Sequence, residues 1–201
     1  MKTSIKTSPQ ERKLGFRILF LAMFAIGTGQ TLFIAVLPPY ARGLGLSEVQ
    51  VGFIFSLSAL GWMVMSPFWG KKSDFIGRKS IIILGLVVYA LATILMGIEF
   101  RLNELGYINL TTLFGLLILT RGCYGFLGSG AHSASMAYVA DRTTEKERSG
   151  VMAVMGSAFA ISGIVGPGLA SVAVLLGPLV PYFLFGGITA FIALLIFIYL
   201  P

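Results

Sequence analysis

The sequence is poor in charge and in the residues that build catalytic or metal sites. Only 11% of its 201 residues are Asp, Glu, Lys or Arg, compared with about 25% in soluble domains. A single cysteine, Cys123, excludes an internal disulfide framework and a cysteine-based metal site. A single histidine, His132, cannot hold a metal ion alone. Since no nucleophile–base set is found either, we expect no enzyme, no metal and no cofactor.

Apolar residues dominate the chain instead. The hydrophobic set makes up 56% of the residues, and 25 glycines add to it. Six apolar stretches of about 20 residues are long enough to cross a hydrocarbon core about 30 Å thick. We therefore predict an all-α integral membrane protein, with a cytoplasmic segment at 1–15 and a six-helix transmembrane bundle over 16–201. The predicted helices lie at about 16–37, 49–69, 80–98, 110–140, 149–176 and 180–200.

The basic residues fall mainly in alternate connections of this bundle. Twelve of the fifteen lie on one side, namely Lys2, Lys6, Arg12, Lys13, Arg17, Lys71, Lys72, Arg78, Lys79, Arg142, Lys146 and Arg148. Because Lys and Arg concentrate in cytoplasmic loops, we expect a multi-pass protein of the plasma (inner) membrane with both termini in the cytoplasm. The net charge of +7 is not gathered on one face or tail, so nucleic-acid binding is not predicted.

The acidic residues, in contrast, fall in connections or at helix ends. They are Glu11, Glu48, Asp74, Glu99, Glu104, Asp141, Glu145 and Glu147. We therefore expect no carboxylate deep in the membrane, which leaves Arg121 and His132 as the titratable groups at depth.

Arg121 lies eleven residues after Leu110, about 16 Å into its helix. An unpaired charge at that depth costs about 2.5–3.5 kcal/mol on insertion scales. Two interpretations remain open: a structural arginine that bonds carbonyls of a neighbouring helix, or a cavity arginine for substrate or coupling.

Three further residues join Arg121 as candidates for substrate binding or coupling. Gln30 lies in a small, polar interruption of the first helix, G-T-G-Q-T. It could pack against a neighbouring helix or face a cavity, and the two roles can coexist. Phe33 lies one turn further on. His132 has serines nearby, where a histidine is more often a packing residue than a proton relay.

A charged segment, G-K-K-S-D-F-I-G-R-K, connects the second and third helices. It spans residues 70–79 and begins with Gly70. Its glycines permit backbone angles that other residues avoid, so we expect a tight cytoplasmic turn. Small residues also concentrate elsewhere, and for these we predict close helix packing: Gly125 in the fourth helix, and Gly156, Gly163, Gly166 and Pro167 in the fifth.

Six spans with such a turn resemble the amino-terminal half of a major facilitator superfamily transporter. The family turn reads G-x-L-(S/A)-D-(R/K)-x-G-R-(K/R), and this chain matches it at Gly70, Ser73, Asp74, Gly77, Arg78 and Lys79. Lys72 and Phe75 depart from it. Arg121 and Gly125 resemble the family's R-x-x-x-G stretch, and the glycines of helix five resemble in part the pattern of drug–proton antiporters. Two residues, rather than three, separate Gly163 from Gly166.

The resemblance implies secondary active transport by alternating access, here efflux of small apolar or amphiphilic compounds, with proton coupling an open point. It implies gating by Gly70, Asp74, Gly77, Arg78, Lys79, Asp141 and Arg142, with Asp141 an expected partner for Arg78. The partners expected are a small-molecule substrate and membrane lipid. Two alternatives are a carrier of a polar or anionic metabolite and a half-length, non-transporting assembly or regulatory subunit.

Transporters of this family normally have twelve spans, and only one half is present. A fragment or truncation of a longer protein is the favoured interpretation. The other interpretation is a short chain that pairs with another chain or, as a homodimer, with a second copy of itself, because the halves are related by an axis along the membrane normal.

Overall fold

The computed structural model describes residues 9–200, which form helices joined by short connections and contain no strand. The helices are α1 (Pro9–Gly43), α2 (Glu48–Ile76), α3 (Arg78–Glu104), α4 (Leu110–Cys123), the π-helical segment η1 (Tyr124–Gly128), α5 (Gly130–Asp141), α6 (Glu145–Leu175) and α7 (Val180–Tyr199). Since α4, η1 and α5 form one run, six helices are long and apolar enough to span a membrane. The predicted fold class, an all-α integral membrane protein with six spans, is confirmed.

The first three helices extend at both ends beyond the apolar stretches that predicted them. The largest difference is at the charged segment 70–79, where α2 continues to Ile76 and α3 begins at Arg78. The expected tight turn is therefore reduced to Gly77, whose φ of +102° lies in the region that glycine tolerates best. Hydropathy reports the thickness of the hydrocarbon core, whereas a helix continues into the aqueous layer until its backbone is interrupted.

The fourth span is interrupted, where one continuous helix was expected. Its α-helix ends at Cys123, and five residues of π-helix follow before α5 begins at Gly130. A β-carbon at Gly125 would lie 2.6 Å from the carbonyl oxygen of Ser58 in α2. The irregular turn therefore coincides with a very close approach of α2, and π-helical turns are frequent at functional sites.

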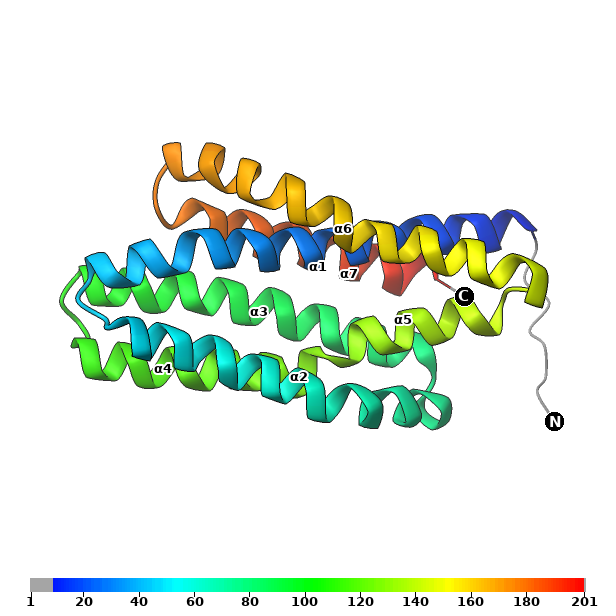
Figure 1. The fold of residues 1–201 in the computed structure, drawn as a ribbon, viewed down its shortest axis with the longest axis horizontal. Coiled ribbons are helices and arrows are strands. Elements are labelled where there is room, and N and C mark those ends of the chain that lie inside the picture. Colours follow the sequence, from blue (N-terminus) through cyan, green and yellow to red (C-terminus); the bar gives the residue numbers. More distant parts are fainter. Residues whose placement is uncertain (1–8, 201) are drawn as a thin grey trace.

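Each helix of the bundle packs mainly against a small set of others. α1 packs mainly against α6 and α7, while α3 packs against α7, α5 and α4, and α2 packs against α4, η1 and α5. Figure 1 shows the helices running along the long axis, with α6 (yellow to orange) on the opposite side of the bundle from α2 (cyan). One apolar core includes Leu19, Ile82, Ala134 and Ile196, and a second includes Leu37, Ile54, Phe100 and Leu113.

Two of the six spans bury few of their residues within the described part of the chain. Only 22% of the residues in the most apolar window of α2 are buried, and 28% in that of α6, compared with 61% in α1. Large apolar side chains on these helices are exposed, for example Met63 in α2 and Ile164 in α6. A membrane protein can present such surface to lipid or to another helical unit.

Candidate functional site

Arg121, in α4, is 5% exposed and is surrounded by aromatic rings. Its guanidinium carbon lies 3.8 Å from the ring centroid of Phe33, 5.1 Å from that of Tyr124 and 6.0 Å from that of Phe55. Within residues 9–200, no ion pair to Arg121 is found, and its Nε has no hydrogen-bond partner. The positive charge of Arg121 is therefore stabilised by aromatic ring faces. A negatively charged ligand could bind this guanidinium without displacing a carboxylate of the described residues.

The guanidinium lines a pocket of about 400 Å³ between α1, α2 and α4. Its lining residues are Gln30, Ile34, Phe55, Ser58, Ala59, Trp62, Arg121 and Tyr124. Gln30 Nε2 donates a hydrogen bond of 2.6 Å to the Tyr124 hydroxyl. Gln30 thus combines the two roles left open for it, because it bonds a neighbouring helix and faces the cavity. The pocket has apolar and aromatic walls with a small number of polar groups, which is typical of small-molecule sites.

The remaining predicted candidates lie outside the pocket lining. Phe33 is 4% exposed and lies beneath Arg121. It also makes edge contacts with Phe55 at 5.3 Å and with Tyr182 at 6.2 Å between ring centroids. The His132 ring makes a tilted contact with Trp62, 5.8 Å between ring centroids, and an edge contact with Phe159 at 5.2 Å. Phe33 therefore supports the arginine, and His132 packs behind Trp62.

Sequence reasoning missed Tyr124, Trp62 and Ser58. The spacing of Tyr124 from Arg121 offered a signal, because residues three apart share one helix face. Nothing in the sequence pointed to Trp62 or Ser58, since both come from α2, whose approach to α4 depends on tertiary packing.

Small residues bring α2 against this site. Ser58 Oγ donates a hydrogen bond of 3.0 Å to the backbone carbonyl of Arg121. A β-carbon at Gly61 would lie 2.9 Å from the backbone of Gly125, and one at Gly125 would lie 2.6 Å from Ser58 O. The two glycines therefore face each other across the contact, and neither position has space for a larger residue.

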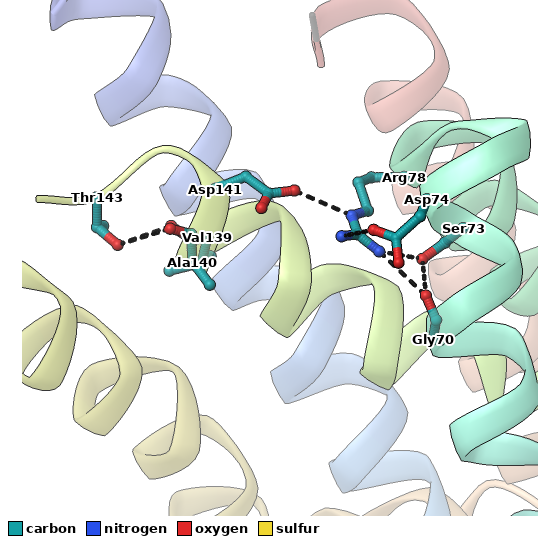
Figure 2. Close-up of polar contacts among 8 residues, drawn as sticks. All are labelled: Gly70, Ser73, Asp74, Arg78, Val139, Ala140, Asp141 and Thr143. Atoms are coloured by element: carbon teal, nitrogen blue, oxygen red, sulfur yellow. Dashed lines mark hydrogen bonds and ion pairs between the residues drawn. The ribbon is translucent and has the colours of Figure 1, made fainter. Parts of the chain in front are cut away.

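A second cluster forms around Arg78 at the junction of α2, α3 and α5, and Figure 2 shows its contacts. Arg78 Nε donates to Asp141 Oδ2 at 3.1 Å, and its Nη2 pairs with Asp74. Its Nη1 donates to the Gly70 carbonyl at 3.1 Å and to the Ser73 hydroxyl. One guanidinium thus connects the last turns of α2 with the end of α5. The side chain is only 16% exposed, so these bonds are better shielded than those of an ordinary surface pair.

Thr143 fixes the end of α5 beside this cluster. Its hydroxyl is buried and donates to the carbonyl of Val139 at 2.9 Å (Figure 2). Thr144 begins α6 with a capping box that also uses Glu147. The two threonines therefore define where α5 ends and α6 begins, and this places Asp141 opposite Arg78.

Two basic residues expected to take part in gating make other contacts. Lys79 Nζ lies 5.8 Å from the ring centroid of Phe197 in α7. The guanidinium carbon of Arg142 lies 3.7 Å from the ring centroid of Tyr138. The backbone carbonyl of Arg142 accepts a hydrogen bond from Arg12. The structure therefore brings Gly70, Asp74, Arg78 and Asp141 together, with Gly77 as the hinge glycine, and places Lys79 and Arg142 beside rings.

The glycines expected to mediate packing divide into two groups. Gly125 packs against α2 as described, and a β-carbon at Gly166 would lie 3.0 Å from the carbonyl of Thr28 in α1. No atom of the described residues lies within 4 Å of a β-carbon built at Gly156 or Gly163. Pro167 lies inside α6, which continues through it. Gly156 and Gly163 are thus on the exposed side of α6.

Glu99 is not where the sequence placed it. Because α3 continues to Glu104, Glu99 lies inside the helix, and its side chain is 6% exposed. Thr120 Oγ1 in α4 donates a hydrogen bond to Glu99 Oε1. The expectation that every carboxylate lies in a connection or at a helix end is therefore wrong for Glu99, since an apolar window does not mark where a helix ends. Over residues 9–200, no group of three or more potential ligands could hold a metal ion.

Comparison with known proteins identifies the family. A family model described as Major Facilitator Superfamily matches residues 19–201. The chain belongs to this superfamily of membrane transporters, which confirms the resemblance first seen in the turn around Gly70. It is accordingly a multi-pass membrane protein related to transporters and not to enzymes.

Similar proteins include bacterial drug-resistance proteins. The chain is 32% identical over 179 residues to multidrug resistance protein 2 of Bacillus subtilis, a match that covers 89% of this chain and 42% of that protein. It is 26% identical over 186 residues to the quinolone resistance protein NorA of Staphylococcus aureus, a match that covers 92% of this chain and 45% of that protein. The chain thus spans less than half the length of these relatives.

The fold matches a solved structure. The crystal structure of the human organic anion transporter MFSD10 (TETRAN) superimposes with a TM-score of 0.73 at 24% sequence identity, covering 97% of this chain and 48% of that one. The described bundle is therefore one six-helix half of the major facilitator fold.

Proposed function

We propose that this chain is the amino-terminal half of a secondary active transporter that exports small apolar or amphiphilic compounds by alternating access, coupled to proton movement. The names of the relatives from Bacillus subtilis and Staphylococcus aureus, which refer to multidrug and quinolone resistance, support efflux. We propose further that the protein resides in the plasma membrane with both termini in the cytoplasm. The concentration of Lys and Arg at one end of the bundle supports this orientation.

The observation that carries the proposal is the pocket beside Arg121. The arginine lies about 16 Å from the start of α4, near the middle of the span. Substrate sites of such transporters lie near the bilayer midplane, at the interface between the two halves. The aromatic side chains of Phe55, Trp62 and Tyr124 provide walls for apolar rings, and Gln30 and Arg121 provide polar contacts.

The Arg78 cluster supports a gating role at the cytoplasmic end. In the proposed cycle this cluster holds α2, α3 and α5 as one rigid unit, so that the end of α2 can press against the opposite half or separate from it. The sparsely covered faces of α2 and α6 are the surfaces that would contact that half. The opposite half is the remainder of a longer chain or a second copy of this one, as a homodimer.

A second candidate substrate class is favoured by one specific feature. The Arg121 guanidinium has no ion-pair partner among the described residues, and bonds between Arg and a carboxylate are among the strongest polar contacts. A polar or anionic metabolite would supply that partner. Thermal stabilisation of the purified protein by an anion, lost in Arg121→Gln, would favour this class over neutral compounds.

The test of the proposed function is flux in proteoliposomes that contain the protein in its assembled form, with its second half or as a dimer. We expect saturable movement of a lipophilic dye, driven by a pH gradient and abolished by Arg121→Ala. The Arg101→Ala variant is the matched control, because Arg101 is exposed and pairs with Glu104 at 3.0 Å, away from the pocket lining. Absence of saturable flux from every assembly would contradict transport and favour a non-transporting subunit.

A further inference from the structure

Glu99 is a buried carboxyl group that the pocket and the Arg78 cluster leave unexplained. It is 6% exposed, and one of its two oxygens, Oε1, accepts the hydrogen bond from Thr120. The other, Oε2, is buried and has no partner in the described part of the chain. An acid of this kind inside a membrane helix is rare and usually functional.

The carboxyl group lies toward the outer end of α3 but inside the helix, five residues before it ends at Glu104. Glu99 follows the cytoplasmic start of α3 by 21 residues, about 31 Å along the helix axis, and its partner Thr120 lies about 15 Å from the outer end of α4. Side chains on a helix lean toward its amino terminus, so the carboxyl group points from its own backbone toward the membrane centre. The hydrogen bond thus joins α3 and α4 below the outer surface.

No charged group offsets a negative charge at this position. The titratable groups on neighbouring elements include Arg121 in α4, Tyr124 in η1, Tyr182 in α7 and Tyr40 in α1, together with Arg101 and Glu104 in α3 itself. Arg101 pairs with Glu104, which also accepts a hydrogen bond from Tyr40. The guanidinium of Arg121 stacks on Phe33. Among the described residues, none of these groups bonds Glu99, and a buried charge without a partner is strongly disfavoured.

We propose that Glu99 is the proton-binding site of this half, with the exchangeable proton on Oε2. The inference rests on the transport function proposed above and identifies the group that would couple transport to protons. In the closed arrangement seen here, the neutral acid is retained between α3 and α4. When these helices separate, water reaches Oε2, the proton leaves, and the carboxylate remains hydrated until the helices close again.

Two contact paths connect this acid to the Arg121 pocket. The first is direct, because Thr120, the hydrogen-bond donor, is the residue before Arg121 in α4. The second passes through rings: Phe100, next to Glu99, lies 5.5 Å from Tyr182, which lies 6.2 Å from Phe33. Phe33 in turn lies beneath the guanidinium. Loss of the proton would therefore disturb the support of the arginine that faces the substrate.

Infrared spectroscopy of the purified chain in lipid nanodiscs tests the proposal. At neutral pH we expect a carbonyl band of a protonated carboxyl group that shifts after exchange into D2O. The band should be absent from Glu99→Gln and retained in Glu104→Gln, whose carboxyl group lies at the end of the same helix. Thr120→Val keeps the acid but removes its donor, so it should shift the band without abolishing it.

The outcomes separate clearly. A missing band, or a band that persists in Glu99→Gln, would overturn the assignment, and a band that never shifts in D2O would overturn proton exchange. Because the measurement requires no flux, a negative result leaves transport itself standing. Conversely, failure of the flux experiment would count against the proposed function and not against protonation of Glu99.

Discussion

Arg78 Nε and Asp141 Oδ2 lie 3.1 Å apart, so that the first residue of α3 is bonded to the last residue of α5. The two residues are 63 positions apart in the chain and are separated by two membrane crossings. Their contact joins the charged segment between the second and third spans to the connection before the fifth. This relationship gives both charges one mechanical task, which is to hold three helix ends together.

The strength of that bond is the first prediction. A double-mutant cycle with Arg78→Gln and Asp141→Asn should give a coupling free energy of about 0.5–1 kcal/mol, at the upper end for partly exposed pairs. The reason is the limited exposure of the two side chains, 16% and 34%. Unfolding in mixed detergent micelles measures it. The pair Arg42 and Glu48, exposed to 50% and 80%, is the control and should couple more weakly; equal coupling would argue against shielding at Arg78.

Asp74→Asn should abolish transport while leaving the protein inserted and folded. Asp74 pairs with Arg78 one turn away across Gly77, and its side chain is 55% exposed. Loss of this ion pair therefore lowers the stability of the bundle only slightly, but it releases the end of α2 from α3. Dye flux in proteoliposomes and size-exclusion profiles measure the two properties. Unchanged flux in Asp74→Asn would refute a gating role for this cluster.

Arg121→Lys should reduce transport by at least about tenfold, which corresponds to 1.4 kcal/mol. A lysine keeps the charge but loses the planar group that stacks on Phe33 and lies beside Tyr124. Arg101→Lys, in the exposed last turn of α3, is the matched control and should transport normally. If Arg121→Lys transported as well as the wild type, charge alone would be sufficient and the stacking argument would fail.

Gly125→Ala should destabilise the bundle by about 1–3 kcal/mol, the usual cost of overpacking. Its β-carbon would lie 2.6 Å from the backbone of Ser58, where only movement of α2 could relieve the contact. Gly115→Ala in the same span meets no atom within 4 Å and should be neutral or stabilising. Thermal unfolding of both variants provides the comparison, and equal melting temperatures would show that α2 is not held this closely.

Much of the architecture followed from the sequence, because a span requires only a long apolar stretch. The depth of Arg121 could also be estimated, since a helix rises by a constant amount per residue. The surroundings of Arg121 could not be predicted, because Phe33, Tyr124 and Phe55 come from three different elements.

The differences at helix ends have one cause. Hydropathy locates the membrane and not the helix boundary. For this reason α2 ends later than predicted, at Ile76, and Glu99 lies inside α3 and not after it. The π-helical turn at Tyr124 depends on the approach of α2 to Gly125, which no local pattern encodes. The contact between Arg78 and Asp141 was expected, whereas the ring contacts of Lys79 and Arg142 were not.

Ligand binding at the Arg121 pocket is measured most directly through the fluorescence of Trp62, which lines it. The titration compares cyclohexylbutyrate with its methyl ester, and Trp62→Phe identifies the reporter. We predict that both ligands change the emission and that Arg121→Gln weakens binding of the carboxylate by about tenfold or more, as expected for a charged hydrogen bond, with little effect on the ester. If neither ligand alters Trp62, or if Arg121→Gln leaves carboxylate binding unchanged, Arg121 does not form the substrate site.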